Sequence, residues 1–214
     1  MDKIKQFCKA HPILFMGVYT LIYFSLFAYL EATVKPQFII DCFIDDYIPF
    51  CEFFIIPYLM WFIFIPGTLF FLLYKDRDAF WRMAGMMFIG NMLCLLIYAL
   101  FPNGVPPKHP VYEENIFCSL VNVLYHNDTP TNVCPSIHVL DTLAAHIAIC
   151  KSSIADRIPS LKPLSAIFLV LVCLATVMLK QHSIIDVFCA FILVFALEKL
   201  IYSNVAQKKH IPIV

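Results

Sequence analysis

The sequence predicts an all-α membrane protein, a polytopic bundle of six transmembrane helices that forms one domain over residues 1–214. Composition is the first indication, because 61% of the 214 residues are hydrophobic and only 14% are charged. Soluble domains average about 45–50% apolar and about 25% charged residues. Apolar runs of bilayer length and a one-sided distribution of Lys and Arg are the other two indications. A formal net charge of zero argues against a nucleic-acid-binding protein.

Four apolar runs are long enough to cross a membrane as helices, which takes about 17–25 residues. They are residues 13–30, 53–74, 83–101 and 183–201. Two further runs are shorter or interrupted: residues 164–179 are apolar throughout, and residues 137–154 include His138, Asp141 and His146. We expect both to span, because a helix that faces the bundle interior tolerates polar groups. The first run lacks a small-residue cleavage site, so we expect a retained helix rather than a signal peptide.

Basic residues predict the orientation of these helices, since cytoplasmic loops are enriched in Lys and Arg. With six spans and a cytoplasmic N-terminus, twelve of the 15 basic residues lie on the cytoplasmic side. Only Lys35, Lys108 and Lys180 lie on the other side. Omitting the interrupted fourth span would move the basic cluster in residues 151–162 outside. We therefore keep that span and expect both termini in the cytoplasm.

Two long loops are then expected on the extracytoplasmic side. The first, residues 31–52, mixes acidic and apolar residues, which favours a helix lying at the membrane interface. The second, residues 102–135, exceeds the length of about 12–15 residues above which loops are often functional. It ends in TPTNVCPSIHV, residues 129–139.

The stretch PSIH marks the predicted start of the fourth helix. Pro135 and Ser136 suit a first turn, because proline lacks an N–H and a serine oxygen accepts from a free one. Capping alone does not account for His138. This histidine stands at the positive end of a helix, where free N–H groups attract anions and phosphate in particular.

A second histidine is expected at the same level of the membrane, in the stretch LKQHSIID that starts the sixth helix. His182 and Asp186 are four residues apart and share one face of a helix. A carboxylate that accepts from one ring nitrogen leaves the lone pair of the other nitrogen exposed, as a nucleophile or a base. Lys108 and Lys180 lie on the same side, where an anion near both histidines would explain these two exceptions to the charge bias.

These motifs resemble a known family. PSIH, followed 44 positions after its histidine by HSIID, is similar to the second and third motifs of the type 2 phosphatidic acid phosphatase superfamily. Its members include lipid phosphate phosphatases, polyprenyl pyrophosphate phosphatases and, more distantly, sphingomyelin and inositol phosphorylceramide synthases. Membrane members have six helices and an outward-facing site. The resemblance covers residues 101–187, and the preceding helices contribute topology only.

The resemblance implies a role for each matching residue. His182 is the nucleophile that takes the phosphoryl group, Asp186 orients it, and His138 protonates the leaving oxygen. Ser136, together with the helix start, binds phosphate. Two family arginines are absent: Lys108-His109 stands in place of Arg-Pro, and Thr176 in place of an arginine ahead of the third motif. We therefore assign Lys108 and Lys180 to phosphate, although Arg and Lys are not equivalent in bidentate contacts.

The expected function is a phosphatase that hydrolyses a phosphomonoester or pyrophosphate of a membrane lipid through a phosphohistidine, without metal or cofactor. Transfer of a phospho-headgroup to a lipid alcohol, as in the sphingolipid-type synthases, is the alternative. A small proton-coupled transporter is the non-enzymatic alternative. The expected partners are the lipid substrate and the bilayer, with no nucleic acid. The sequence leaves the lipid, the acceptor and the oligomeric state open.

The remaining polar residues are interpreted as structural. Asp141 and His146 fall inside the fourth helix, where they can extend a polar network. Four cysteines lie in apolar runs and behave as small hydrophobes. The redox state of Cys42, Cys51, Cys118 and Cys134, which lie in loops, is left open.

Overall fold

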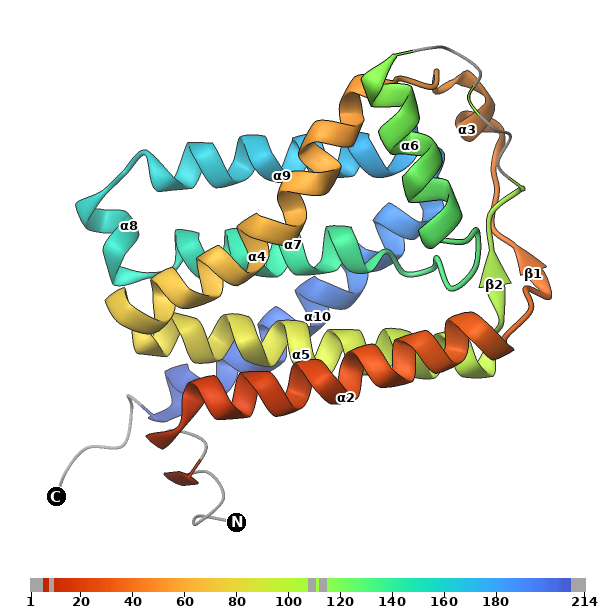
Figure 1. The fold of residues 1–214 in the computed structure, drawn as a ribbon. Coiled ribbons are helices and arrows are strands. Elements are labelled where there is room, and N and C mark those ends of the chain that lie inside the picture. Colours follow the sequence, from red (N-terminus) through yellow and green to blue (C-terminus); the bar gives the residue numbers. More distant parts are fainter. Residues whose placement is uncertain (1–5, 8–9, 108–110, 112–114, 209–214) are drawn as a thin grey trace, which may run out of the picture.

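A computed structural model of the chain describes residues 6–7, 10–107, 111 and 115–208, and these residues are mostly helical (Figure 1). The elements in chain order are α2 (Pro12–Thr33), β1 (Phe38–Ile39), α3 (Phe43–Tyr47), the 3-10 helix η1 (Glu52–Phe54), α4 (Ile55–Lys75), α5 (Arg77–Leu100), β2 (Asn103–Gly104), α6 (Ile116–Asn127), α7 (Ile137–Cys150), α8 (Ser153–Arg157), α9 (Leu161–Met178) and α10 (Ile184–Lys208). The predicted helical fold is confirmed.

Four of these helices have the length and apolar composition of membrane spans, within the part of the chain that the structure describes. They are α2, η1 with α4 (Glu52–Lys75), α5 and α9. Helix α7 is apolar but shorter. The count of six spans and the orientation of the termini stay predictions.

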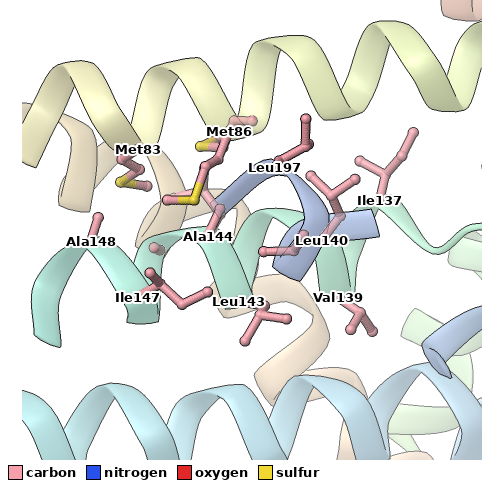
Figure 2. Close-up of a cluster of buried hydrophobic side chains, with 14 of the residues drawn as sticks. Met83, Met86, Ile137, Val139, Leu140, Leu143, Ala144, Ile147, Ala148 and Leu197 are labelled. Atoms are coloured by element: carbon pink, nitrogen blue, oxygen red, sulfur yellow. The ribbon is translucent and has the colours of Figure 1, made fainter. Parts of the chain in front are cut away.

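Helix α7 lies at the centre of the bundle, in contact with α5, α9 and α10 (Figure 2). Eleven of its 14 residues are buried. They pack against Met83 and Met86 of α5 and Leu197 of α10. Gly90 of α5 permits the close approach, because a Cβ there would lie 2.9 Å from a methyl carbon of Leu140. The helix that carries the PSIH stretch is thus fixed from three sides.

Helix α2 lies at the edge of the bundle and packs mainly against α5 (Figure 1). Pro12 is the one buried residue among its 22. The Tyr19 ring stacks on Phe88 with 3.7 Å between centroids, and the Tyr19 hydroxyl donates to the Phe88 carbonyl at 3.0 Å. The remaining large apolar side chains of α2 are mostly exposed, as expected for a surface that faces lipid.

One end of the bundle, which we call the α6 end, is built from the two long loops (Figure 1). Strand β1 pairs in parallel with β2, so that Phe38 lies opposite Asn103. The loop predicted over residues 102–135 contains the 12-residue helix α6, which is capped by Asn115. The interfacial helix expected in residues 31–52 is limited to the five residues of α3.

At the opposite end, which we call the α8 end, helix α7 stops four residues earlier than predicted. It ends at Cys150 rather than at residue 154. The reason is local: the Ser152 hydroxyl accepts from the Ala155 N–H at 3.3 Å and thereby caps the new helix α8.

Asp76 joins α8 to the turn between α4 and α5. Its carboxylate accepts from the Ser153 N–H and hydroxyl, at 2.7 Å each, and from the Ala79 N–H at 3.0 Å. Desolvation opposes ionisation here, but these hydrogen bonds and the nearby Arg82 outweigh it, so the pKa of Asp76 is lowered.

Candidate active site

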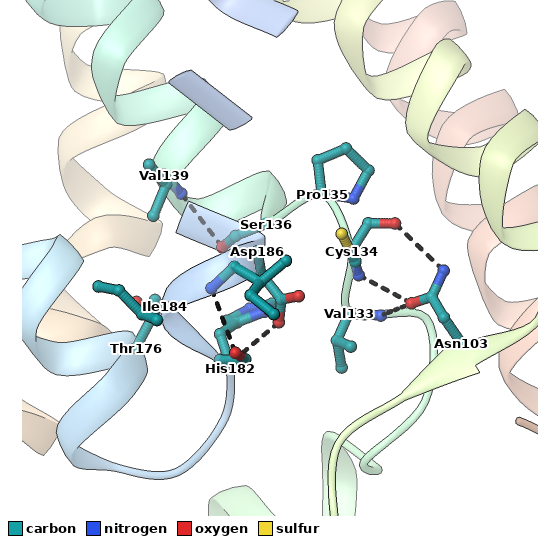
Figure 3. A network of polar contacts seen from close by, with 12 residues as sticks. Asn103, Val133, Cys134, Pro135, Ser136, Val139, Thr176, His182, Ile184 and Asp186 are labelled. Carbon is teal, nitrogen blue, oxygen red and sulfur yellow. Dashed lines mark hydrogen bonds and ion pairs between the residues drawn. The ribbon is translucent and has the colours of Figure 1, made fainter. Parts of the chain in front are cut away.

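The path of the chain into α7 is fixed by side chains of the preceding segments. Asn103 Oδ1 accepts from the N–H groups of Val133 and Cys134, at 3.0 and 2.8 Å, and Asn103 Nδ2 donates to the Cys134 carbonyl at 3.1 Å (Figure 3). The Tyr98 hydroxyl donates to the Pro135 carbonyl at 2.5 Å. Buried backbone groups require such partners, so these bonds stabilise one arrangement of the loop.

Ser136 caps α7, which confirms that part of its prediction. Its hydroxyl accepts from the Val139 N–H at 3.5 Å, and its own N–H donates to the Asp186 carbonyl at 3.2 Å. The second bond ties the start of α7 to the first turn of α10 (Figure 3). The Ser136 side chain is buried and lies outside the walls of the two cavities described below. Its role in phosphate binding stays a prediction.

His182 and Asp186 are in contact, although not as two residues of one helix. Helix α10 begins at Ile184, so His182 belongs to the preceding turn, and the expected shared helix face is wrong in this detail. The distance from His182 Nδ1 to Asp186 Oδ2 is 3.2 Å, and the Ser183 N–H donates to the same oxygen at 3.0 Å (Figure 3). Because a carboxylate only accepts, this contact places the proton on Nδ1 and the lone pair on Nε2.

His138 lies in the first turn of α7 among aromatic rings from α4. The centroid of its ring is 4.5 Å from that of Tyr58 and 4.6 Å from that of Trp61. Tyr58 is itself fixed, since its hydroxyl donates to Asp128 Oδ2 at 2.6 Å. The rings of His138 and His182 are 5.7 Å apart and inclined by 63°. The two predicted histidines therefore lie side by side, although they come from separate segments.

Two cavities meet at His182, which lines both of them. The first, of about 460 Å³, has three aspartates and one lysine in its wall, and we call it the acidic cavity. These residues are Asp41, Asp45, Asp46 and Lys180. The second, of about 250 Å³, lies between α2 and α4 and also contains His138; we call it the aromatic cavity. Its wall includes Tyr23, Phe24, Phe27, Trp61 and Phe62.

The two predicted phosphate-binding lysines have different outcomes. Lys180 lines the acidic cavity, but its Nζ donates to the carbonyls of Asp45 and Ile48, at 2.8 and 2.5 Å. Its ammonium group thus ties α3 to the turn before His182, and its contact with phosphate stays a prediction. Lys108 lies outside the described residues.

Asp45 occupies the start of α10. Its Oδ1 accepts from the Ile184 N–H at 2.9 Å, and its Oδ2 from the Ser183 hydroxyl at 2.6 Å. Desolvation raises the pKa of Asp45, but hydrogen bonds from Ser183, Ile184 and Cys42 outweigh it, so that the pKa is lowered overall. An ionised side chain already fills the anion position at this helix start.

Further titratable groups surround the site without joining it. Desolvation raises the pKa of the Cys134 thiol, and the charge of Asp186 raises it further. The eight described cysteines are free thiols. In the described part of the chain, no three His, Cys, Asp or Glu side chains cluster as a metal site requires. Catalysis without a metal stays a prediction.

Asp141 and His146 lie deeper along α7 than His138. The distance from Asn91 Nδ2 to Asp141 Oδ2 is 3.5 Å, which joins α5 to α7. His146 Nδ1 lies 2.8 Å from the Ser165 hydroxyl of α9. Both contacts connect neighbouring helices, which fits the structural interpretation of these residues.

Sequence reasoning missed several residues that hold the site together. Glu31, at the end of α2, accepts from the Thr129 N–H at 3.2 Å, from the Thr131 hydroxyl at 3.1 Å and from Asn132 Nδ2 at 3.0 Å. Glu31 thereby links the end of α2 to the loop that leads to PSIH. The sequence also provided no indication of the side-chain hydrogen bonds of Asn103 and Tyr58. It likewise did not indicate that Gln181 is buried in the wall of the aromatic cavity. An isolated acid at the end of an apolar run was the one available signal, for Glu31.

Comparison with family models, with curated proteins and with solved structures finds no match to this chain. The resemblance to the phosphatase superfamily therefore depends on the PSIH and HSIID motifs themselves. The arrangement of these residues carries the functional argument.

Proposed function

We propose that this protein is a membrane lipid phosphatase that acts through a phosphohistidine intermediate. The observation that carries the proposal is the pair of imidazoles, 5.7 Å apart between ring centroids, one of which is bound to a buried carboxylate. Both rings line one cavity between helices that have the composition of membrane spans. Covalent phosphoryl transfer requires a nucleophile, a group that orients the nucleophile, and a proton carrier. His182, Asp186 and His138 are the residues proposed for these three roles.

In the first step, His182 Nε2 attacks the phosphorus of a lipid phosphate or pyrophosphate. A P–N bond forms while the P–O bond to the leaving group breaks, and His138 donates a proton to the departing oxygen. In the second step, water attacks the phosphorus, the P–N bond breaks, and His138 takes the proton from the water. Asp186 holds the His182 ring with its lone pair toward the phosphorus throughout, as the Nδ1 contact at 3.2 Å suggests.

The proposed setting is a six-span protein with both termini in the cytoplasm and the site at the extracytoplasmic side. The distribution of Lys and Arg supports this orientation, because the α8 end carries Lys75, Arg77, Lys151 and Arg157. The aromatic cavity has residues of α2 and α4 in its wall, and we propose that a lipid chain enters between these helices to reach His138. A cysteine-free variant with single cysteines in α3 and α8, labelled from one side of a vesicle, tests the orientation.

Transfer of a phospho-headgroup to a lipid alcohol is the second candidate, and the acidic cavity favours it. Three aspartates beside His182 disfavour a doubly charged phosphomonoester more than a singly charged phosphodiester. In this version a hydroxyl of the acceptor lipid replaces water in the second step. The polar headgroup of a diester would lie in the acidic cavity and the hydrocarbon in the aromatic one.

The decisive experiment uses the full chain in detergent or nanodiscs with excess EDTA. Phosphate release is measured from phosphatidic acid and from a polyprenyl pyrophosphate, and transfer is measured from a labelled phosphodiester lipid to diacylglycerol. The wild type is compared with His182→Ala and with His146→Ala, a matched histidine variant outside the site. We expect loss of turnover for His182→Ala alone, together with an acid-labile phosphoryl adduct on the wild type. Turnover that survives His182→Ala, or that requires a divalent metal, contradicts the proposal.

A further inference from the structure

Three consecutive residues before α10 divide between the two cavities. Lys180 lines the acidic cavity, Gln181 lines the aromatic cavity together with His138, and His182 lines both. Gln181 is only 2% exposed, so this amide is enclosed within the protein next to the paired histidines. Neither PSIH nor HSIID includes Gln181, so the motifs assign no role to this residue.

The backbone of the turn fixes the direction of Gln181. Lys180 adopts a left-handed conformation with φ of 53°, which reverses the chain after α9. The N–H groups of Gln181 and His182 both donate to the Thr176 carbonyl at 3.0 Å. The Tyr125 hydroxyl donates to the Leu179 carbonyl at 2.8 Å and braces the same turn. Lys180 is directed toward α3, whereas Gln181 lines the aromatic cavity together with His138 of α7.

The chemistry of the proposed reaction requires a donor at this point. A transferring phosphoryl group spreads negative charge over three oxygens, and catalysis depends on groups that stabilise this charge. Asp45 fills the start of α10, and the Lys180 ammonium is bound to two carbonyls. The backbone N–H groups at the start of α7 supply part of the stabilisation. A side-chain N–H beside both histidines would supply the rest.

We infer that the Gln181 side-chain amide donates a hydrogen bond to a non-bridging phosphoryl oxygen during transfer between His182 and the oxygen that His138 protonates. The inference rests on the proposed function. Thr176 stands where the superfamily has an arginine, and it contributes its backbone carbonyl to this turn. In our inference, the side chain of Gln181 takes the place of that arginine as a donor to the phosphoryl group. A neutral amide also suits a site that already contains the carboxylates of Asp45 and Asp186.

Two other carboxamides line the aromatic cavity, Asn127 at the end of α6 and Asn132 in the loop before α7. Asn127 Nδ2 donates to the Val123 carbonyl at 2.7 Å, and Asn132 Nδ2 donates to Glu31 Oε2 at 3.0 Å. Gln181 differs from both because it directly precedes His182 in the chain. Gln37, an exposed glutamine whose side chain lies outside both cavities, provides the matched control.

The test compares kcat and KM for Gln181→Glu, Gln181→Ala and Gln37→Ala with the wild type, using whichever lipid phosphate or phosphodiester the wild type turns over. Removing one donor to a developing oxyanion lowers kcat by about 10²–10³-fold. We expect that loss, with little change in KM, for both Gln181 variants and a change below about threefold for Gln37→Ala. Gln181→Glu has nearly the same shape as glutamine, so it decides the outcome if the alanine variant is unstable.

A second measurement separates this inference from the proposed function. Sodium orthovanadate, which adopts the five-coordinate geometry of phosphoryl transfer, is titrated into each variant by calorimetry. We expect the wild type and Gln37→Ala to bind alike and Gln181→Glu to bind at least about tenfold more weakly. If His182→Ala is inactive while both Gln181 variants keep wild-type kcat and vanadate affinity, the inference is wrong and the proposed function stands. If the wild type neither turns over nor binds vanadate, both are wrong.

Discussion

His138 and His182 are the same type of residue, 5.7 Å apart between ring centroids, yet their surroundings differ in kind. His182 has a buried carboxylate on Nδ1 and lies where two cavities meet. His138 is packed against the rings of Tyr58 and Trp61, at 4.5 and 4.6 Å between centroids. One imidazole is thus oriented by a charge, and the other is enclosed by aromatic rings.

The difference teaches which histidine suits which role. A carboxylate on Nδ1 fixes one tautomer and leaves the lone pair on Nε2, as a nucleophile requires. Aromatic ring faces within about 6 Å attract a cation, so we expect the rings around His138 to suit an imidazolium, the form that a proton donor must adopt. The surroundings support the assignment of His182 as nucleophile and His138 as acid, and the following experiments test that difference.

The largest effect is expected for His182→Ala. Without a nucleophile, no phosphoryl-enzyme forms, so we expect turnover to fall by more than about 10⁴-fold. A substrate with a nitrophenolate leaving group does not restore the rate, because bond formation to nitrogen is still lost. The measurement is release of nitrophenolate and of phosphate in detergent. Recovery with the activated substrate would falsify the assignment of His182 as nucleophile.

Asp186→Asn is expected to lower turnover by up to about 10⁴-fold, since an amide can donate to His182 and reverse its tautomer. The expected signature is a lower kcat at an unchanged KM, with protein that is folded by circular dichroism. The Asp186 carboxylate also accepts a hydrogen bond from the Ser183 N–H at 3.0 Å, so a substitution can disturb the turn as well as His182. Asp186→Glu serves as the control because it keeps the charge. An Asn variant as active as the Glu variant contradicts the orienting role.

His138→Gln is expected to lower turnover of natural lipid phosphates by about 10²–10⁴-fold, the usual contribution of a positioned proton donor. In contrast to His182→Ala, the rate with a nitrophenolate leaving group should return toward the wild-type value, since that group departs without protonation. Comparing the two substrates in the two variants separates acid from nucleophile. Equal losses on both substrates would show that the two histidines do not differ in role.

The sequence predicted the helical parts of the fold well because bilayer length is a local property. The run 164–179 corresponds to α9, observed at Leu161–Met178. Helix α7 ended early because the Ser152 cap competes with continuation of the helix, and apolar periodicity does not report caps. Helix α6 was missed because its 12 residues fall short of the length of about 17–25 residues that a membrane span needs.

The two motifs predicted which two histidines would lie close together, but not which residues hold them in place. Glu31 and Thr129 are 98 positions apart, and Asp45 and Ile184 are 139 apart. Contacts over such separations depend on how the helices pack, which no local pattern encodes. For the same reason Lys180 was assigned to phosphate, whereas its ammonium group also has two carbonyl partners from the α3 segment.

Two substitutions at Tyr58 sharpen the account of the His138 surroundings. Tyr58→Phe removes the hydrogen bond to Asp128 but keeps the ring, so we expect a loss of about 1.5–3 kcal/mol in unfolding free energy and a change in kcat below about threefold. Tyr58→Leu also removes the aromatic face, and kcat should fall a further tenfold or so. Denaturant unfolding in mixed micelles and kinetics measure the two effects. Equal activity of Phe and Leu variants would argue against aromatic stabilisation of the imidazolium.

The smallest effects are expected from two aspartates at opposite ends of the bundle. Asp45 holds the start of α10 beside His182, and Asp76 holds α8 against the turn between α4 and α5. Hydrogen bonds lower the pKa of both carboxyls below the usual value of 3.8. A lowered pKa in the folded state contributes stability at pH values above 3.8, and this contribution is lost as the pH falls through the lowered pKa.

Asp45→Asn and Asp76→Asn should therefore both lower Tm at about pH 7, and the difference from the wild type should shrink toward about pH 3. Only Asp45→Asn should also lower kcat, by a few-fold, because Asp45, unlike Asp76, contacts the segment that carries Gln181 and His182. Thermal unfolding over this pH range and turnover at neutral pH measure the two effects. A Tm difference that does not depend on pH would contradict the ionised state of these carboxyls. An equal loss of kcat in both variants would show that Asp45 does not affect turnover through its contact with the segment before α10.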